Sequence, residues 1–158
     1  MTALTGSTLT VEIKTNKNMA KVIYNDIIPF KGYKAITILP FIFARNSAKW
    51  LKDYVLNHEC IHFRQQLEVL IAAAVCDIML IMLLGISWWW LFASLLFYYT
   101  WYGLEWLIRL AICHDTNLAY KNIVFEQEAY LNEYDMTYLK NRKLFAWVEY
   151  IGKQSFRK

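Results

Sequence analysis

The stretch His58-Glu59-Cys60-Ile61-His62, which continues as Phe63-Arg64-Gln65-Gln66, decides what fold and chemistry this sequence can support. In a helix, residues four apart lie on one face about one turn apart, so both imidazoles can reach the same metal ion. Glu59 then lies beside the metal. Its carboxylate can take a proton from zinc-bound water and later return it to a leaving amine. The spacing therefore predicts zinc-dependent hydrolysis, with Glu59 as the general base.

The residues around this HExxH motif favour a long helix. Asn46 and Ser47 are good N-cap residues, and neither Pro nor Gly follows until Gly85, so we expect a helix over 47–84. The apolar residues before the motif recur at helical spacing, on the same stripe as the two histidines. The histidines are therefore expected to face inward.

A zinc site of this kind needs a third protein ligand. The sequence offers Glu126 or Glu128 on a second predicted helix, and His114 at the end of an apolar run. Glu126 shares its helix face with Ala129, Tyr130 and Glu133, and a small residue at 129 would let the motif helix approach. The residues alone leave these three ligand candidates open.

The composition is that of a membrane protein. Of the 158 residues, 58% are hydrophobic and 17% aromatic, which is more apolar surface than one small domain can bury. The net charge of +4 suits an anionic membrane surface. No basic cluster with interleaved aromatics is found, which argues against nucleic-acid binding. The three cysteines, odd in number, indicate reduced thiols in a reducing compartment.

Two apolar runs predict a transmembrane helical hairpin, with a buried soluble or lipid-surface hairpin as the alternative. Residues 69–84 are apolar except for Asp77, residues 88–112 are apolar and aromatic except for Glu105 and Arg109, and the chain between them contains Gly85. Asp77 is expected to bond across the hairpin to Ser94, Tyr98 or Tyr99, and Glu105 is expected to pair with Arg109.

The distribution of lysines and arginines predicts the orientation of this hairpin. Basic residues lie on both sides of it, whereas its tip carries three tryptophans and no charge. The positive-inside rule therefore places both termini and the HExxH motif on the cytoplasmic side of the inner membrane.

The remaining segments complete a single domain over 1–158, mainly α with a short N-terminal β-hairpin. A polar stretch over 1–20 has no secretory signal and contains a candidate short strand at 10–13. The β-hairpin follows over 21–45, with strands at 22–28 and 35–43. After the helix over 47–84 and the second apolar run over 88–112, we expect C-terminal helices over 122–158, including an amphipathic one at 143–151. Pro29 and Pro40 predict edge strands.

The order of these parts resembles the membrane-embedded gluzincin peptidases, a family that includes the bacterial heat-shock membrane protease and the eukaryotic prenyl-protein (CaaX) protease. The shared order is HExxH, a transmembrane hairpin, and then E-x-x-A opening a helix at Glu126. The extended motif over 58–66 is also similar to the HExxHxxQQ of small bacterial metallopeptidase domains. The resemblance covers about 47–133 and implies a zincin-like core.

The resemblance implies a full ligand set. The zinc ligands would be His58, His62 and Glu126, with Glu59 as the base. One position departs from the family pattern, because Tyr130 stands where the family has an Asp that orients a ligand histidine.

No residue is obviously assigned to stabilise the oxyanion. Tyr130, Tyr134 and Arg109 are the candidates for that role or for orienting a ligand.

These features predict a membrane zinc metallopeptidase that acts on a peptide or protein substrate by Glu59-assisted attack of zinc-bound water. A second hypothesis is a catalytically silent protein that keeps the zincin-like core as a scaffold and binds another membrane protein. A third is a structural hairpin protein in which HExxH is coincidental. Two spans alone cannot enclose a site within the lipid, so self-association or a membrane-protein partner is also expected.

Overall fold

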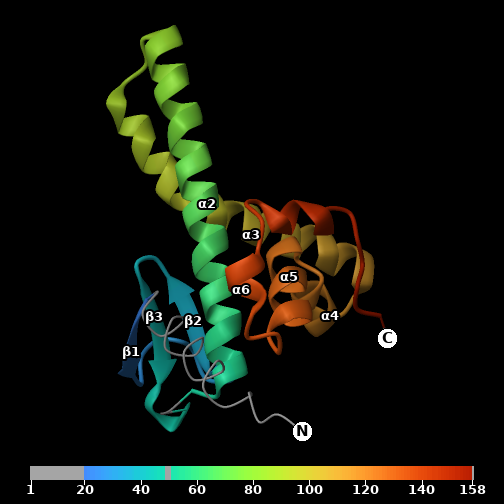
Figure 1. Cartoon of the computed structure of the whole chain (residues 1–158). Helices are drawn as coiled ribbons and strands as arrows, with labels where there is room; N and C mark the ends of the chain where they lie inside the picture. Colours follow the sequence, from blue (N-terminus) through green and yellow to red (C-terminus); the bar gives the residue numbers. More distant parts are fainter. Residues whose placement is uncertain (1–19, 49–50, 158) are drawn as a thin grey trace, which may run out of the picture. The chain divides into compact units, whose positions relative to one another are not determined.

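The computed structural model describes residues 20–48 and 51–157, and it is mainly helical with a small three-stranded sheet near the N-terminus (Figure 1). The predicted strand at 10–13 lies outside the described residues. In chain order the elements are β1 (Lys21–Asn25), β2 (Ala35–Ile38), β3 (Phe41–Arg45), η1 (Asn46–Ala48), α2 (Asp53–Leu84), η2 (Trp88–Trp90), α3 (Leu91–Cys113), α4 (Thr116–Lys121), α5 (Val124–Asn132), α6 (Tyr138–Asn141) and η3 (Ala146–Tyr150).

The chain divides into two compact units. The first contains the described residues up to Arg64 together with Ala129–Lys143, and the second contains Gln65–Glu128 and the described residues from Leu144 on. The division points fall inside α2, inside α5 and between α6 and η3. Each unit is described by itself.

The sheet of the first unit differs from the predicted hairpin. The strand order is β1-β3-β2, with β1 parallel to β3 and β2 antiparallel to β3. The hairpin is formed by β2 and β3, where Ile38 pairs with Phe41 around Leu39 and Pro40. The prediction of a single strand over 35–43 was wrong, because Pro40 has no backbone N–H to donate to a strand ladder and lies in the turn. The prediction of edge strands holds for β1 and β2, whereas β3 is central.

The core of the first unit lies between the sheet and the first half of α2. Alternate residues of β3, Ile42 and Ala44, are fully buried, as the period-two pleat requires. Ile42 clusters with Cys60 and Ile61 of α2 and with Ala129 of α5. Cys60 is thus a core residue on a different face of α2 from the two histidines.

The motif helix begins later than Asn46 and Ser47 predict. These two residues form the short helix η1, and α2 starts at Asp53, where the backbone carbonyl of Lys52 accepts from the amides of Val55 and Leu56. The predicted C-terminal end is confirmed, since α2 ends at Leu84.

The second unit contains the apolar half of α2 and all of α3. Gly85 adopts a positive φ of 63° between the two helices, which a residue without Cβ allows. The hydroxyl of Ser94 donates to the Asp77 carboxylate, which confirms the expected bond. Glu105 and Arg109 form the expected ion pair, with N–O separation 3.0 Å.

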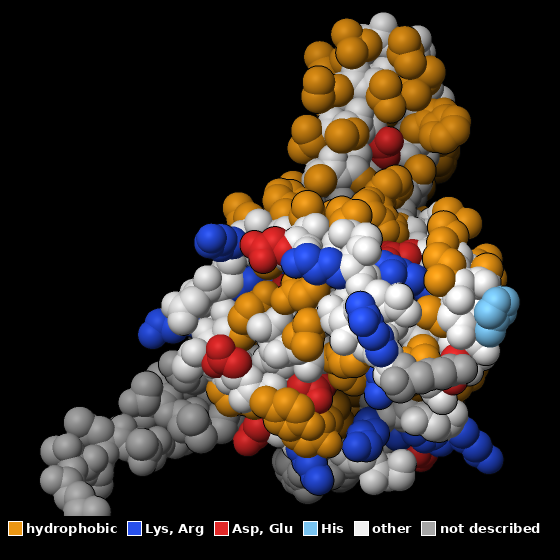
Figure 2. All heavy atoms as spheres, turned by 90° about the vertical axis from the view of Figure 1, so that its right-hand side faces the viewer, with side chains coloured by type: hydrophobic (Ala, Val, Ile, Leu, Met, Phe, Trp, Pro, Cys, Tyr) orange, Lys and Arg blue, Asp and Glu red, His pale blue; other side chains and the backbone are white. Residues whose placement is uncertain are grey.

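Among the described residues, α2 is the one helix long and apolar enough to cross a membrane, and 17% of its most apolar window is buried. Its counterpart α3 has 23 residues, but tyrosines, tryptophans and the Glu105–Arg109 pair lower its mean hydropathy. Figure 2 shows hydrophobic side chains gathered over the free end of the α2–α3 hairpin, the upper end in that view. Crossing by both helices therefore stays a prediction.

The C-terminal region is less helical than predicted. The short helix α4 precedes α5, and α5 begins at Val124. The prediction of an amphipathic helix over 143–151 was wrong, because this segment has only the short 3-10 helix η3. The residue before η3, Phe145, lies in the left-handed region with φ 55°. A non-glycine residue with positive φ interrupts a regular helix there.

Candidate metal centre

The two motif histidines face one point from successive turns of α2. His58 and His62 have exposed fractions of 8% and 7%, so both are buried as predicted. Their Nε2 atoms lie 3.0 Å apart, and their ring centroids are separated by 4.7 Å. Two ring nitrogens converging in this way can share one proton or direct both lone pairs at one metal ion.

The second nitrogen of His58 contacts a carboxylate. Its Nδ1 lies 3.0 Å from Oε2 of Glu133, which follows the last residue of α5. The ring of His58 also packs edge-on against Tyr130, with centroids 4.7 Å apart. Tyr130 therefore contributes a ring contact to His58, whereas the Glu133 carboxylate contacts the Nδ1 atom of the imidazole.

The proposed base, Glu59, is held by the sheet. Its carboxylate accepts a hydrogen bond of 2.7 Å from the hydroxyl of Thr37 on β2. The same hydroxyl lies 3.0 Å from the backbone carbonyl of Glu59. Both side chains are buried, with exposed fractions of 6% for Glu59 and 3% for Thr37. The edge strand β2 thus lies beside the motif residue that would move protons.

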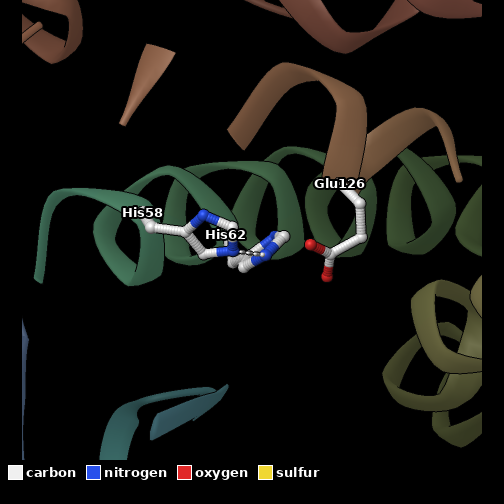
Figure 3. Close-up of side chains that lie close together, drawn as sticks. All are labelled: His58, His62 and Glu126. Carbon is white, nitrogen blue, oxygen red and sulfur yellow. Dashed lines mark hydrogen bonds between the residues drawn. The ribbon is translucent and has the colours of Figure 1, made fainter. Parts of the chain in front are cut away.

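Glu126 completes a three-residue group. Each of His58, His62 and Glu126 offers one ligand atom, and these atoms lie within 4.8 Å of one another (Figure 3). Tyr102 of α3 donates a hydrogen bond of 2.7 Å to Oε1 of Glu126, which fixes the carboxylate. Glu126 is 2% exposed.

The two rival third ligands are engaged or exposed elsewhere. Glu128 is fully buried and accepts from the amide of Gln65 at 3.0 Å. His114 is exposed at the left-handed C-cap of α3, with φ 52°. Among the described residues, the group whose side chains could hold a metal ion is His58, His62 and Glu126, and the choice of the third ligand stays a prediction.

The chemistry of this donor set fits a divalent metal ion. Two imidazole nitrogens and one carboxylate oxygen form a set that catalytic zinc uses while keeping a further position for water. Glu59, Glu126 and Glu133 are all buried. Ionised carboxylates are retained in an interior only when paired, hydrogen-bonded or bound to a metal. The side chains of His58, His62 and Glu126 could therefore hold a metal ion.

The candidates for oxyanion stabilisation differ in their surroundings. Arg109 is engaged by Glu105 and by the carbonyl of Lys153. Tyr134 is 73% exposed, and its ring stacks on Tyr54 at 5.1 Å. The negative charge of Glu133 raises the pKa of Tyr134 above its ordinary value. An ordinary phenol is already protonated at neutral pH, so Tyr134 remains a donor.

No family model matches the chain, and searches of curated proteins and of solved structures found no match. The assignment of function therefore depends on the residues and their geometry.

Three residues with roles at the centre escaped the sequence analysis. Thr37 and Tyr102 carry no motif, and their hydrogen bonds to Glu59 and Glu126 depend on tertiary contacts. Glu133 did leave a signal, since it was placed on the face of Glu126 and Ala129. Its contact with His58 was not predicted.

Proposed function

We propose that this chain is a membrane-associated zinc metallopeptidase. The observation that carries the proposal is the pair of histidine Nε2 atoms 3.0 Å apart, beside a buried glutamate and backed by a carboxylate on the Nδ1 atom of His58. An accidental HExxH on a helix surface would not need buried imidazoles, because solvated side chains satisfy their own hydrogen bonds.

The chain's own residues account for the proton transfers of peptide hydrolysis. His58, His62 and Glu126 would hold the zinc. When bound, zinc lowers the pKa of a coordinated water to about 7 and polarises a carbonyl. Glu59 would accept a proton from the attacking water and pass it to the leaving nitrogen as the peptide C–N bond breaks, giving a carboxylic acid, which keeps the other water proton, and a free amine.

The edge strand β2 offers a place for the substrate backbone. An extended peptide can pair with an exposed strand edge through main-chain hydrogen bonds. β2 is an edge strand, and its Thr37 contacts Glu59. A peptide lying along β2 would therefore pass the residue that serves as base.

The membrane association is supported by the apolar half of α2 and by the hydrophobic surface of the α2–α3 hairpin. We place the motif and both termini on the cytoplasmic side of the inner membrane, because lysines and arginines flank the hairpin and none lies at its tip. A reporter fused after Lys158 that is active only in the cytoplasm tests this side. A second reporter, active only outside the cytoplasm, is fused at the same position, and its activity would contradict a cytoplasmic C-terminus.

The function is tested by pairing zinc content with hydrolysis. Purified protein in mild detergent or in liposomes is incubated with a mixed peptide library, and the products are read by mass spectrometry. The Glu59→Gln variant should keep its zinc and lose hydrolysis, whereas the control Glu149→Gln, on an exposed residue of η3, should keep both. Hydrolysis by Glu59→Gln at the wild-type rate would refute the assignment of the base.

A second candidate function is a catalytically silent protein that binds another membrane protein through the same core. The observation that favours it is the extent of exposed apolar surface on the α2–α3 hairpin, including Met82, Trp89 and Phe92. Zinc binding without cleavage of any library peptide, together with co-purification of one defined membrane protein, would support this alternative.

A further inference from the structure

The imidazole of His58 has a second ring nitrogen, Nδ1, besides the Nε2 that lies near His62. Histidines that bind metals usually donate their other N–H to a carboxylate or carbonyl, which fixes the ring and its tautomer. A residue that contacts Nδ1 can therefore decide how His58 faces a metal.

Glu133 has the required geometry. Its Oε2 lies 3.0 Å from Nδ1 of His58, the nitrogen remote from His62, and the two side chains are 11% and 10% exposed. A carboxylate on Nδ1 favours a proton at that nitrogen, which leaves the lone pair of Nε2 for a metal. The contact is therefore on the correct side of the ring.

The backbone carrying Glu133 is itself anchored to the motif helix. The side-chain amide of Asn57, the residue before His58, donates to the carbonyls of Asn132, Glu133 and Asp135 at 3.2, 3.0 and 3.1 Å. Asn57 is 1% exposed. The side-chain amide of Asn57 thus holds the turn after α5 against α2. Because the backbone of Glu133 is part of that turn, its carboxylate is held near His58.

We propose that Glu133 is the positioning residue of His58. Glu133 holds Nδ1–H of His58 and so presents Nε2 to the metal. Tyr130 packs against the ring of His58 and limits its rotation. The inference rests on the proposed function only in that a metal binds at Nε2 of His58.

The test measures zinc affinity, which does not require peptidase activity. Full-length protein in detergent competes with a chromophoric chelator for Zn²⁺. Removing a partner of this kind typically weakens metal affinity about 10–100-fold. Glu133→Ala should fall in that range, Glu133→Gln should lose less because its amide oxygen still accepts a hydrogen bond, and the exposed control Glu149→Gln should match the wild type.

A second measurement separates positioning from general stability and does not need a metal. The tautomer of His58 is read by ¹⁵N NMR of metal-free protein labelled at histidine. The wild type should show Nδ1–H at His58, and Glu133→Ala should show a mixture of tautomers. The isosteric Glu133→Gln keeps the test available if the alanine variant does not fold.

The outcomes distinguish this inference from the proposed function. Zinc binding by the wild type with unchanged affinity in both Glu133 variants would overturn the inference and leave the proposed function standing. No zinc binding by the wild type would overturn the proposed function. In that case no metal is held at Nε2, and the NMR measurement decides the part that remains, which is that Glu133 sets the tautomer of His58. A His58 tautomer that is the same with and without the Glu133 carboxylate would overturn it.

Discussion

Replacing Thr37 with Val should destabilise the first unit by removing one hydrogen bond. Val has nearly the shape of Thr, so the main change is the loss of the hydroxyl that lies 2.7 Å from the Glu59 carboxylate. Hydrogen bonds to charged groups contribute roughly 1.5–3 kcal/mol, and a buried acceptor left without its donor bears the full desolvation cost. Because both side chains are buried, we expect a loss of about 2 kcal/mol in the free energy of unfolding.

The assay is equilibrium unfolding by denaturant in detergent, followed by circular dichroism, on chelator-treated protein so that metal binding does not contribute. Thr37→Ser keeps the hydroxyl and is the matched control, which should lose less than half as much as Thr37→Val. If the hydroxyl acts through Glu59, the cost of Thr37→Val should shrink when Glu59 is already Ala, because the two changes remove the same bond.

Two results would refute this reasoning. One is a Thr37→Val variant within about 0.5 kcal/mol of the wild type, the range of ordinary surface substitutions. The other is an equal cost of Thr37→Val with and without Glu59, which would assign the effect to packing around β2.

Three further predictions concern other contacts of the two units. Tyr102→Phe removes the donor to Glu126 and should weaken zinc binding about tenfold in chelator competition, and unchanged affinity would contradict a role for this phenol. Asn57→Ala removes the amide that holds three carbonyls and should lower the free energy of unfolding by about 1–3 kcal/mol, with wild-type stability as the contrary result. Ser94→Ala leaves Asp77 without its hydroxyl donor in the α2–α3 hairpin and should lower the thermal midpoint in detergent, whereas Thr100→Val, on an exposed residue of α3, should not.

Local signals in the sequence predicted the α2–α3 helical hairpin well. The end of α2 at Leu84, the turn at Gly85 and the course of α3 follow from apolar runs interrupted by a glycine. The Asp77–Ser94 contact followed from the cost of a carboxylate in an apolar hairpin.

The sheet was predicted less well, because strand pairing is a tertiary property. Residues 22–28 and 35–43 had the composition of strands, but composition does not say which strands pair or in which direction. The parallel pairing of β1 with β3, and the break at Pro40 that creates the hairpin of β2 and β3, both depend on contacts distant in sequence.

The predicted start of α2 was wrong for a different reason. Asn46 and Ser47 are favourable caps wherever a helix begins, so they indicate a possible start without requiring it. In the structure they belong to η1, and α2 begins at Asp53.

The two candidate histidine ligands could be proposed from spacing, whereas the third ligand was left open and the residues that contact the candidate side chains could not be predicted. A spacing of four residues on one helix fixes the relation of His58 to His62. Thr37, Tyr102 and Glu133 act from other elements, and their contacts exist only once the chain has folded.

The measurement that tests the central claim most directly is the zinc content of the detergent-purified protein, with Glu126→Ala and His114→Ala measured in parallel. We predict one zinc per chain in the wild type, retained in His114→Ala and lost in Glu126→Ala. A wild-type protein that takes up no zinc even after reconstitution would contradict the account, because the buried histidines and carboxylates would then serve the fold alone.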